Sequence, residues 1–406
     1  MAKYDQGGGC ACGLYKVCEC GTGPQSDGSI NTVAREIPST KPIKEILMAK
    51  SEEDDQFLDM ASCIESEYGS VASEGVLGDV AGYVSTGSLS FDALLSGTIF
   101  NGGMASNKVL GLAGETSTGK TYFALAVVAK FLKDNPTGYV FYFESETAIT
   151  TDMLTSRDIN TSRVYIDEVA TVQEFRTHAL RILDKYLALP VEKRKPLLFV
   201  LDSLGNLSTD KEIKDISEGK DTRDMTRAQL IRGAFRVLDL RLGKANVPMI
   251  ITNHTYEVIG SYIPTKKMGG GSGLDYAADI IVFLSKTKQK DAGDAKGKNK
   301  NTTGALITAV LKKSRLTIED KKVDMLLDYR TGLDRYYGLL DIAEKLGIFK
   351  KVSNKYEMPD GTKAIESEIL RNPEKFYTDE VLKMINEKCA DEFLYGKTNV
   401  MEAAAE

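Results

Sequence analysis

Short runs of consecutive apolar residues alternate with amphipathic stretches through the middle of the chain. Five runs predict strands: Val109–Ala113, Tyr139–Phe143, Leu197–Leu201, Met249–Thr252 and Ile280–Leu284. Hydrophobicity is continuous within each run, so both faces of each strand are expected to be covered. The pattern predicts an α/β fold, in which helices flank a mainly parallel twisted sheet. The segment of residues 286–300, rich in Lys, Asp, Gly and Asn, predicts a solvated hairpin loop.

An amphipathic stripe precedes this region and a smaller segment follows it. Phe57, Met60, Ala61 and Ile64 recur at the spacing of one helix face, which packs either on the chain's own core or on a neighbouring subunit. A helical pattern at Leu339–Leu346 opens a small α-rich C-terminal segment. Four parts are therefore expected: an arm over 1–50, a helix and strand over 51–83, a core over 84–335 and a small domain over 336–406.

The first predicted strand leads into a glycine-rich loop with the pattern GxxxxGK[ST]. Residues 114–121 read Gly-Glu-Thr-Ser-Thr-Gly-Lys-Thr, and residues 122–132 predict a helix after them. In this context backbone N–H groups and the helix N-terminus cradle phosphate oxygens. Lys120 is expected to neutralise the β- and γ-phosphates, and the Thr121 hydroxyl to ligate Mg²⁺. The predicted residues of this ATP and Mg²⁺ site are Gly114, Glu115, Thr116, Ser117, Thr118, Gly119, Lys120, Thr121 and Tyr122.

Polar side chains follow three further predicted strands, at the edge where α/β sheets bind ligands. Asp202 follows the third strand and is the expected partner of Mg²⁺, through water or Thr121. Glu144 and Glu146 follow the second strand. One of them is a candidate for orienting the attacking water, and the pattern alone does not separate it from a structural acid bonded by loop backbone. His254 follows the fourth strand, where sensing of a phosphate is favoured over a purely structural role.

The composition restricts the classes of function. The 406 residues carry a net charge of −6 and are 42% hydrophobic and 27% charged. The sequence contains no run of eighteen apolar residues and no basic-then-apolar leader, so we expect a soluble cytoplasmic protein without a membrane partner. The acidic balance argues against a protein that coats DNA through bulk charge, but it leaves DNA binding by local loops open.

Four of the six cysteines, Cys10, Cys12, Cys18 and Cys20, are crowded near the N-terminus. Close thiols in a cytosolic protein are more often metal ligands than disulfides. However, Cys-x-Cys lacks the two-residue spacer that lets a knuckle wrap one zinc ion. The residues therefore favour a mobile cysteine-rich arm and leave a metal site as the alternative.

Several ordered stretches resemble the RecA family of strand-exchange recombinases, most closely its phage UvsX branch. The resemblance covers about residues 52–350. The stretches that carry it are Val84–Asp92, Asp202–Leu207, Asp224–Ala228, Asn253–Glu257, Gly269–Asp279, Lys313–Arg315 and Gly338–Ala343. It implies a RecA-like P-loop ATPase core, with a polymerisation helix and strand within residues 51–83 that dock on the adjacent subunit. It also implies a cytoplasmic location in a bacterial or phage-infected cell. The cysteine-rich arm of residues 1–50 does not match the family.

The catalytic role of Lys120 follows from the phosphate loop, and the resemblance implies further catalytic residues. Glu146, rather than Glu144, matches the glutamate that polarises the attacking water. His254 stands where bacterial RecA has a glutamine that senses the γ-phosphate, and UvsX also has histidine there. Lys313 and Arg315 match a basic pair that reaches the ATP of the neighbouring protomer, like an arginine finger in trans. A plain surface basic pair is the alternative for these two residues.

Two further segments, about Asn206–Arg227 and Tyr256–Ser272, match the DNA-binding loops of the family. Their basic, aromatic and glycine residues suit contact with the backbone of a single strand without reading of its bases. Acids such as Asp210 and Glu212 offset the charge of the first loop. The predicted DNA-contacting residues are Asn206, Lys211, Arg223, Arg227, Tyr256, Tyr262, Lys266, Lys267, Gly269, Gly270 and Gly271.

Together these features predict a Mg²⁺-dependent and DNA-dependent ATPase that forms helical filaments on single-stranded DNA. It would catalyse homologous pairing and strand exchange in recombination, repair and recombination-dependent replication. The expected partners are single-stranded DNA, homologous double-stranded DNA, further copies of the chain with ATP at the protomer interface, and single-strand-binding and mediator proteins. The alternatives are a ring-forming RecA-fold motor, such as a hexameric helicase, and a non-catalytic filament mediator that binds nucleotide for assembly.

Overall fold

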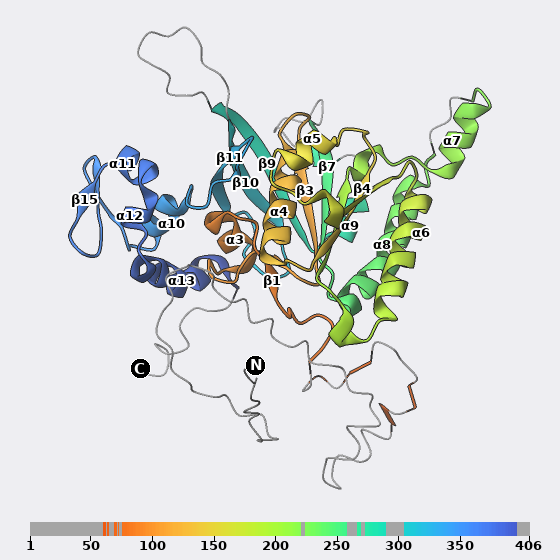
Figure 1. The fold of residues 1–406 in the computed structure, drawn as a ribbon, viewed down its shortest axis with the longest axis horizontal. Coiled ribbons are helices and arrows are strands. Elements are labelled where there is room, and N and C mark those ends of the chain that lie inside the picture. Colours follow the sequence, from red (N-terminus) through yellow and green to blue (C-terminus); the bar gives the residue numbers. More distant parts are fainter. Residues whose placement is uncertain are drawn as a thin grey trace, which may run out of the picture. The chain divides into compact units, whose positions relative to one another are not determined.

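The computed structural model describes residues 60–61, 63–64, 69–70, 72, 75–220, 224–257, 266–268, 273–289 and 304–395 (Figure 1). The predicted arm of residues 1–50, with its four cysteines, and most of the predicted amphipathic helix at 52–67 lie outside these residues. Within the described part, Met60 and Ala61 are helical, and the side chains of Met60 and Ile64 are 58% and 65% exposed. These two apolar side chains are therefore not packed on the chain's own core.

A ten-stranded sheet lies at the centre, in the order β12-β11-β10-β9-β3-β7-β6-β4-β5, with β8 paired to β7. Its parallel part consists of β3 (Val109–Gly114), β4 (Tyr139–Glu144), β5 (Val164–Glu168), β6 (Leu197–Asp202), β7 (Met249–Glu257) and β9 (Ile280–Gln289). The antiparallel part consists of β10 (Gly304–Lys313), β11 (Lys322–Asp328), β12 (Gly332–Leu333) and β8 (Lys266–Met268). The predicted α/β fold with a mainly parallel sheet is confirmed.

The five strands predicted from continuous apolar runs are all present. Their runs are continuous because both faces of these strands are covered. Leu198 and Val200 belong to one hydrophobic cluster, whereas Phe199 and Leu201 belong to the other. In contrast, buried and partly exposed residues alternate along β10 and β11, so these strands lack a continuous run.

The predicted hairpin between β9 and β10 is present, but its loop begins later in the chain than predicted. Backbone pairing continues to Gln289, opposite Gly304.

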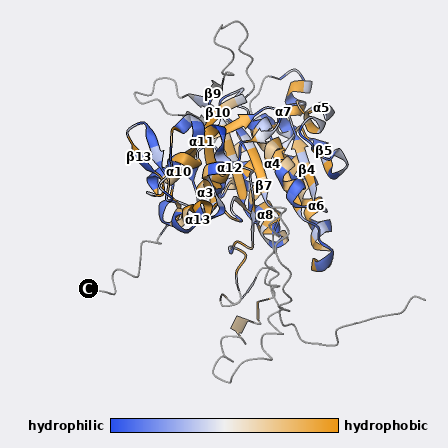
Figure 2. Cartoon of the chain, turned by 60° about the vertical axis from the view of Figure 1, so that its left-hand side comes forward, coloured by the Kyte–Doolittle hydropathy of each residue, from blue (hydrophilic) through white to orange (hydrophobic). Residues whose placement is uncertain are grey.

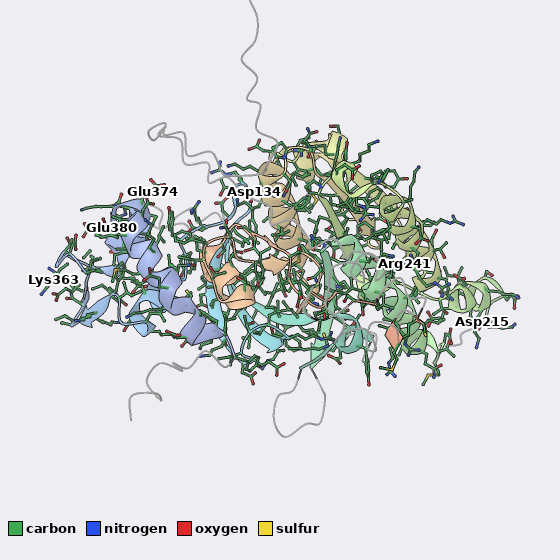
Figure 3. The ribbon with its side chains drawn as sticks, turned by 90° about the horizontal axis from the view of Figure 1, so that it is seen from below. Asp134, Asp215, Arg241, Lys363, Glu374 and Glu380 are labelled. Carbon is green, nitrogen blue, oxygen red and sulfur yellow. The ribbon has the colours of Figure 1, made fainter. Side chains whose placement is uncertain are left out.

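Helices cover both faces of the sheet (Figure 1). The first cluster contains residues of α3 (Leu89–Ser96) and α4 (Lys120–Asp134), and the second contains residues of α6 (Val172–Leu187), α8 (Arg227–Ala245) and α9 (Gly273–Ala277). Figure 2 shows hydrophobic residues concentrated on the sheet and on the helix sides that face it. Shorter elements connect these layers: β1 (Tyr83–Val84), β2 (Met104–Ala105), α5 (Thr151–Thr155) and α7 (Asp210–Ser217). In Figure 3, Asp215 on α7 points to the outside of the molecule.

The C-terminal segment contains a small sheet in addition to the expected helices. Its elements are α10 (Leu339–Lys345), β13 (Lys350–Val352), β14 (Lys355–Glu357), β15 (Lys363–Ala364), α11 (Glu366–Arg371), α12 (Pro373–Phe376) and α13 (Asp379–Phe393). Its apolar side chains join the first hydrophobic cluster. The Asn386 carboxamide oxygen accepts hydrogen bonds from the backbone N–H groups of Ile99 (2.9 Å) and Phe100 (3.1 Å), which ties α13 to the core. Among the helices described, none is long and apolar enough to cross a membrane.

Candidate nucleotide site and DNA-binding loops

The predicted phosphate-binding loop lies between β3 and α4, as the motif requires. Gly119 turns the chain with φ of 95°, a left-handed conformation that favours glycine, and α4 begins at the next residue. The first N–H groups of α4 therefore lie at the end of the loop, where they can bind an anion. Lys286 of β9 also donates a hydrogen bond to the Ser117 carbonyl, although the sequence pattern placed Lys286 in a solvated loop.

Lys120 is held at the base of this loop. Its ammonium donates hydrogen bonds to the carbonyl oxygens of Gly114 (3.0 Å) and Glu115 (2.9 Å), and the side chain is buried. Burial lowers the pKa of Lys120, whereas the nearby carboxylates of Asp202 and Glu146 oppose this shift. Lys120 is thus a positively charged donor close to two acids, as a phosphate site requires.

Asp202 is buried at the carboxyl end of β6, and two hydroxyl groups orient its carboxylate. Tyr142 donates to Oδ2 at 2.7 Å, and Thr252 donates to Oδ1. These donors come from β4 and β7, the strands on either side of β6. An oriented carboxylate, with the Thr121 hydroxyl in the first turn of α4, is the kind of oxygen ligand set that Mg²⁺ prefers. The residues present therefore fit this ion.

Glu144 and Glu146, which the sequence pattern could not distinguish, have different hydrogen-bond partners in the structure. The buried Glu144 carboxylate accepts hydrogen bonds from the backbone N–H groups of Glu146 (2.9 Å) and Ala148 (3.1 Å), so it organises the loop after β4. The Glu146 carboxylate instead contacts side chains of the site, Ser203 at 2.7 Å and His254 at 3.1 Å. Burial alone would raise the pKa of Glu146, but these hydrogen bonds and nearby positive charge lower it below its ordinary value.

His254 connects the lysine of the loop to this glutamate. Its Nδ1 lies 3.4 Å from Lys120 Nζ, and its Nε2 lies 3.1 Å from Glu146 Oε1. A lysine ammonium can only donate and a carboxylate can only accept, so the ring fits a neutral tautomer with the proton on Nε2. His254 lies on β7, two residues before the exposed Tyr256 of the second predicted DNA-binding loop. One strand therefore joins the nucleotide site to that loop.

Lys313 and Arg315 lie at the other end of the parallel strands, away from the carboxyl ends that hold the phosphate loop. Lys313 pairs with Ile281 at the beginning of β9, whereas Gly114 of the phosphate loop pairs with Leu284 further along the same strand. Lys313 donates to the carbonyl oxygens of residues 275 (2.6 Å) and 278 (2.7 Å), and Arg315 lies 3.1 Å from the Asp279 carboxylate. The structure therefore does not bring this pair to Lys120 of the same chain.

The first predicted DNA-binding loop contains a helix, α7, which the sequence interpretation missed. Thr209 and Glu212 form a capping box at its start, and this T-x-x-E pattern was a detectable helix start. Lys211 on α7 and Asn206 before it are exposed. Arg227 instead donates to the carbonyl oxygens of residues 204 (3.2 Å) and 205 (2.5 Å). Arg223 lies outside the described residues.

The second predicted DNA-binding loop begins as a β-hairpin. Tyr256 of β7 pairs with Lys267 of β8, and the Tyr256 side chain is 61% exposed. For Lys266 and Lys267 the structure describes the backbone only. Tyr262, Gly269, Gly270 and Gly271 lie outside the described residues.

Among the described residues, three whose side chains donate hydrogen bonds to Asp202 or Glu146 were not predicted: Tyr142, Ser203 and Thr252. A second unpredicted group surrounds Tyr122, whose ring lies 5.5 Å from the Tyr329 ring and 4.6 Å from the Arg157 guanidinium. Each contact joins segments that are distant in sequence, so spacing within one segment could not reveal it.

Sequence similarity to known proteins covers the part of the chain that contains this site. Residues 59–334 match the family model of the RecA N-terminal domain. Over 260 residues the chain is 33% identical to the recombination and repair protein of Enterobacteria phage T4, a match that covers 64% of this chain and 63% of that protein. It is 26% identical over 277 residues to protein RecA of Paracoccus denitrificans (68% and 72% covered) and 28% identical over 280 residues to protein RecA of Deinococcus radiodurans (68% and 71% covered). The match thus spans less than two thirds of the phage relative.

Proposed function

Since the chain belongs to the family defined by the RecA N-terminal domain, we propose that it is an ATP-dependent DNA recombinase. It assembles as helical filaments on single-stranded DNA, pairs that strand with homologous duplex and exchanges strands, in recombination, repair and recombination-dependent replication. The observation that carries the proposal is the convergence of Lys120, Asp202, Glu146 and His254 at one edge of the sheet. This set supports a DNA-dependent ATPase rather than a protein that only binds nucleotide.

The loop of residues 114–121 would bind the phosphates of ATP, with Lys120 as the charged donor. Thr121 and Asp202 would hold Mg²⁺, directly or through water. When bound, this ion supplies positive charge that stabilises the transferring phosphoryl group. Tyr142 and Thr252 keep the Asp202 carboxylate oriented, so the acid needs no rearrangement to serve as a ligand.

Glu146 would orient the attacking water and accept its proton. Its lowered pKa keeps the carboxylate ionised, which is the form that can accept a proton. His254 lies between Glu146 and Lys120, so a γ-phosphate bound at Lys120 would change the hydrogen bonds of the ring. Because His254 and Tyr256 share β7, that change can be passed to the second DNA-binding loop.

The position of Lys313 and Arg315 supports assembly through the nucleotide. A basic pair at the edge opposite the phosphate loop can serve the ATP of a neighbouring protomer in a head-to-tail filament. The exposed Met60 and Ile64 lie in the segment expected to dock on the adjacent subunit. The nucleotide site would therefore be completed only in the filament.

The DNA would contact the two loops through exposed groups such as Lys211 and Tyr256, with base pairing supplying the choice of sequence. Single-strand-binding and mediator proteins are expected to control access to the strand.

ATP hydrolysis measured with and without single-stranded DNA tests this proposal in one assay. Strong stimulation by the DNA is expected, because β7 joins the nucleotide site to a DNA-binding loop. Electron microscopy of the same samples should show open helical filaments. Closed rings would favour a hexameric motor, and filament assembly without hydrolysis would favour a non-catalytic mediator.

A further inference from the structure

The hydroxyl of Ser203 contacts the acid that is expected to orient the attacking water. Ser203 Oγ donates a hydrogen bond of 2.7 Å to Glu146 Oε1, and the serine is fully buried. A hydroxyl that donates to a carboxylate belongs to the stronger, charge-assisted class of hydrogen bonds. The sheet register brings the two together, because Glu144 of β4 lies opposite Asp202 of β6 and each residue of the contact follows closely after.

A second serine fixes the position of Ser203. Ser145 Oγ accepts a hydrogen bond from the backbone N–H of Ser203 (2.9 Å) and donates one to its carbonyl oxygen (2.8 Å). The backbone N–H of Ser145 also donates to the carbonyl of Asp202 (2.9 Å). These bonds join the turn after β4 to the turn after β6, so the Ser203 hydroxyl is anchored to the sheet.

The hydrogen bonds to Glu146 leave one of its oxygens available. Ser203 and His254 both contact Oε1, at 2.7 Å and 3.1 Å. From the part of the chain that the structure describes, Oε2 receives no hydrogen bond. Burial alone would raise the pKa of Glu146, and the bonds from Ser203 and His254 together with nearby positive charge more than offset it. The carboxylate is thus ionised, held by one oxygen and open at the other.

We propose that Ser203 is a positioning residue for ATP hydrolysis, whose hydroxyl holds Glu146 so that Oε2 faces the attacking water. This inference rests on the proposed function, since it requires that Glu146 orient that water. A serine that only satisfied its own buried hydroxyl would affect the stability of the fold. A positioning serine affects the turnover rate and its dependence on pH as well.

The full-length Ser203→Ala variant tests this role through its DNA-stimulated ATPase, measured as a function of pH. We expect kcat to fall about 10- to 100-fold, because small misplacements of a catalytic group have effects of this size. The KM for ATP should stay within about twofold, because Ser203 does not belong to the phosphate loop. Loss of the hydrogen bond raises the pKa of Glu146, so the acid limb of the profile should move to higher pH.

Two further variants make the comparison specific. Ser203→Thr retains the hydroxyl and should recover most of kcat. Ser88→Ala is the matched control, since Ser88 is also fully buried and, among the described residues, its hydroxyl bonds only to a serine outside the site, Ser90 at 3.0 Å. Its kcat and pH profile should equal those of the unmodified protein.

Unchanged kcat and an unmoved acid limb in Ser203→Ala would overturn the inference, even if the variant were less stable to urea. Should that variant not fold, the nearly isosteric Ser203→Cys, with its weak thiol donor, gives the same comparison, and unmodified kcat there would overturn the inference too. Glu146→Gln separates this outcome from failure of the proposed function. Full turnover in Glu146→Gln would contradict the role of Glu146 itself, whereas an inactive Glu146→Gln with an unaffected Ser203→Ala would contradict only the role of Ser203.

Discussion

Mixing two inactive variants would reveal whether a second protomer completes the nucleotide site. Lys120→Ala removes the charged donor of the phosphate loop, and Arg315→Ala removes a basic group at the opposite edge of the sheet. The Arg315 side chain is 63% exposed, whereas its partner Asp279 is 13% exposed and keeps a hydrogen bond of 3.0 Å from the backbone N–H of Val109, so this change should cost the fold only about 1–2 kcal/mol. A group that stabilises transition-state charge is worth about 10²- to 10³-fold in kcat, so Arg315→Ala alone should be nearly inactive.

The expected recovery follows from counting interfaces. In an equal random mixture, half of the protomers carry an intact phosphate loop and half carry an intact Arg315. A working interface needs one of each, so about one quarter of the unmodified DNA-stimulated ATPase should return when the interface is head-to-tail. The assay is phosphate release at fixed total protein, with the ratio of the two variants as the variable.

A second mixture supplies the control. Lys120→Ala and Glu146→Gln both damage the same half of the interface, so their mixture should stay inactive at every ratio. If the mixture of Lys120→Ala and Arg315→Ala also stays inactive, Arg315 does not act on a neighbouring protomer, and its position away from Lys120 does not reflect a shared site.

Two other predictions concern buried groups. Tyr142→Phe removes the hydroxyl that donates to the Asp202 carboxylate and keeps the ring, so the Mg²⁺ concentration for half-maximal ATPase should rise about 10- to 100-fold. Tyr165→Phe, at an exposed tyrosine, is the control. An unchanged Mg²⁺ requirement in Tyr142→Phe would contradict the role of Asp202. Burial, and then the charge of Asp279, raise the pKa of Asp239 from 3.8 to about 7. The folded state therefore binds a proton on Asp239 more tightly than the unfolded state does. Ionisation of Asp239 consequently lowers the stability of the fold as the pH rises from about 4 to 7. Asp239→Asn should therefore raise the free energy of unfolding at pH 8 by up to about 4 kcal/mol, and a gain in urea denaturation that is equal at pH 4 and pH 8 would exclude this explanation.

The sequence predicts the part of the fold in which burial leaves a continuous pattern. The run at 197–201 is apolar throughout because its alternate residues enter two different hydrophobic clusters. In β10 the residues on one side are buried and those on the other are partly exposed, and Thr308 breaks the apolar run. The helix α7 was hidden because its charged residues resemble a loop, although the cap formed by Thr209 and Glu212 gives its start.

The candidate site was predictable where a motif carries the chemistry and not where tertiary contacts decide it. Lys120 follows from the glycine-rich loop. Glu144 ends β4 and Glu146 lies two residues beyond it, so strand alternation predicts both on the same side, and only the loop backbone that binds Glu144 distinguishes them. Ser203 reaches Glu146 across a chain separation of 57 residues, through a strand register that no local pattern specifies.

The most direct test of the recombinase proposal is strand exchange between circular single-stranded DNA and homologous linear duplex. With ATP and Mg²⁺, joint molecules should form and then resolve into nicked circular products, and neither should form with Lys120→Ala or with a duplex of unrelated sequence. Filaments that assemble with ATP on the single strand but yield no joint molecules would contradict the proposal.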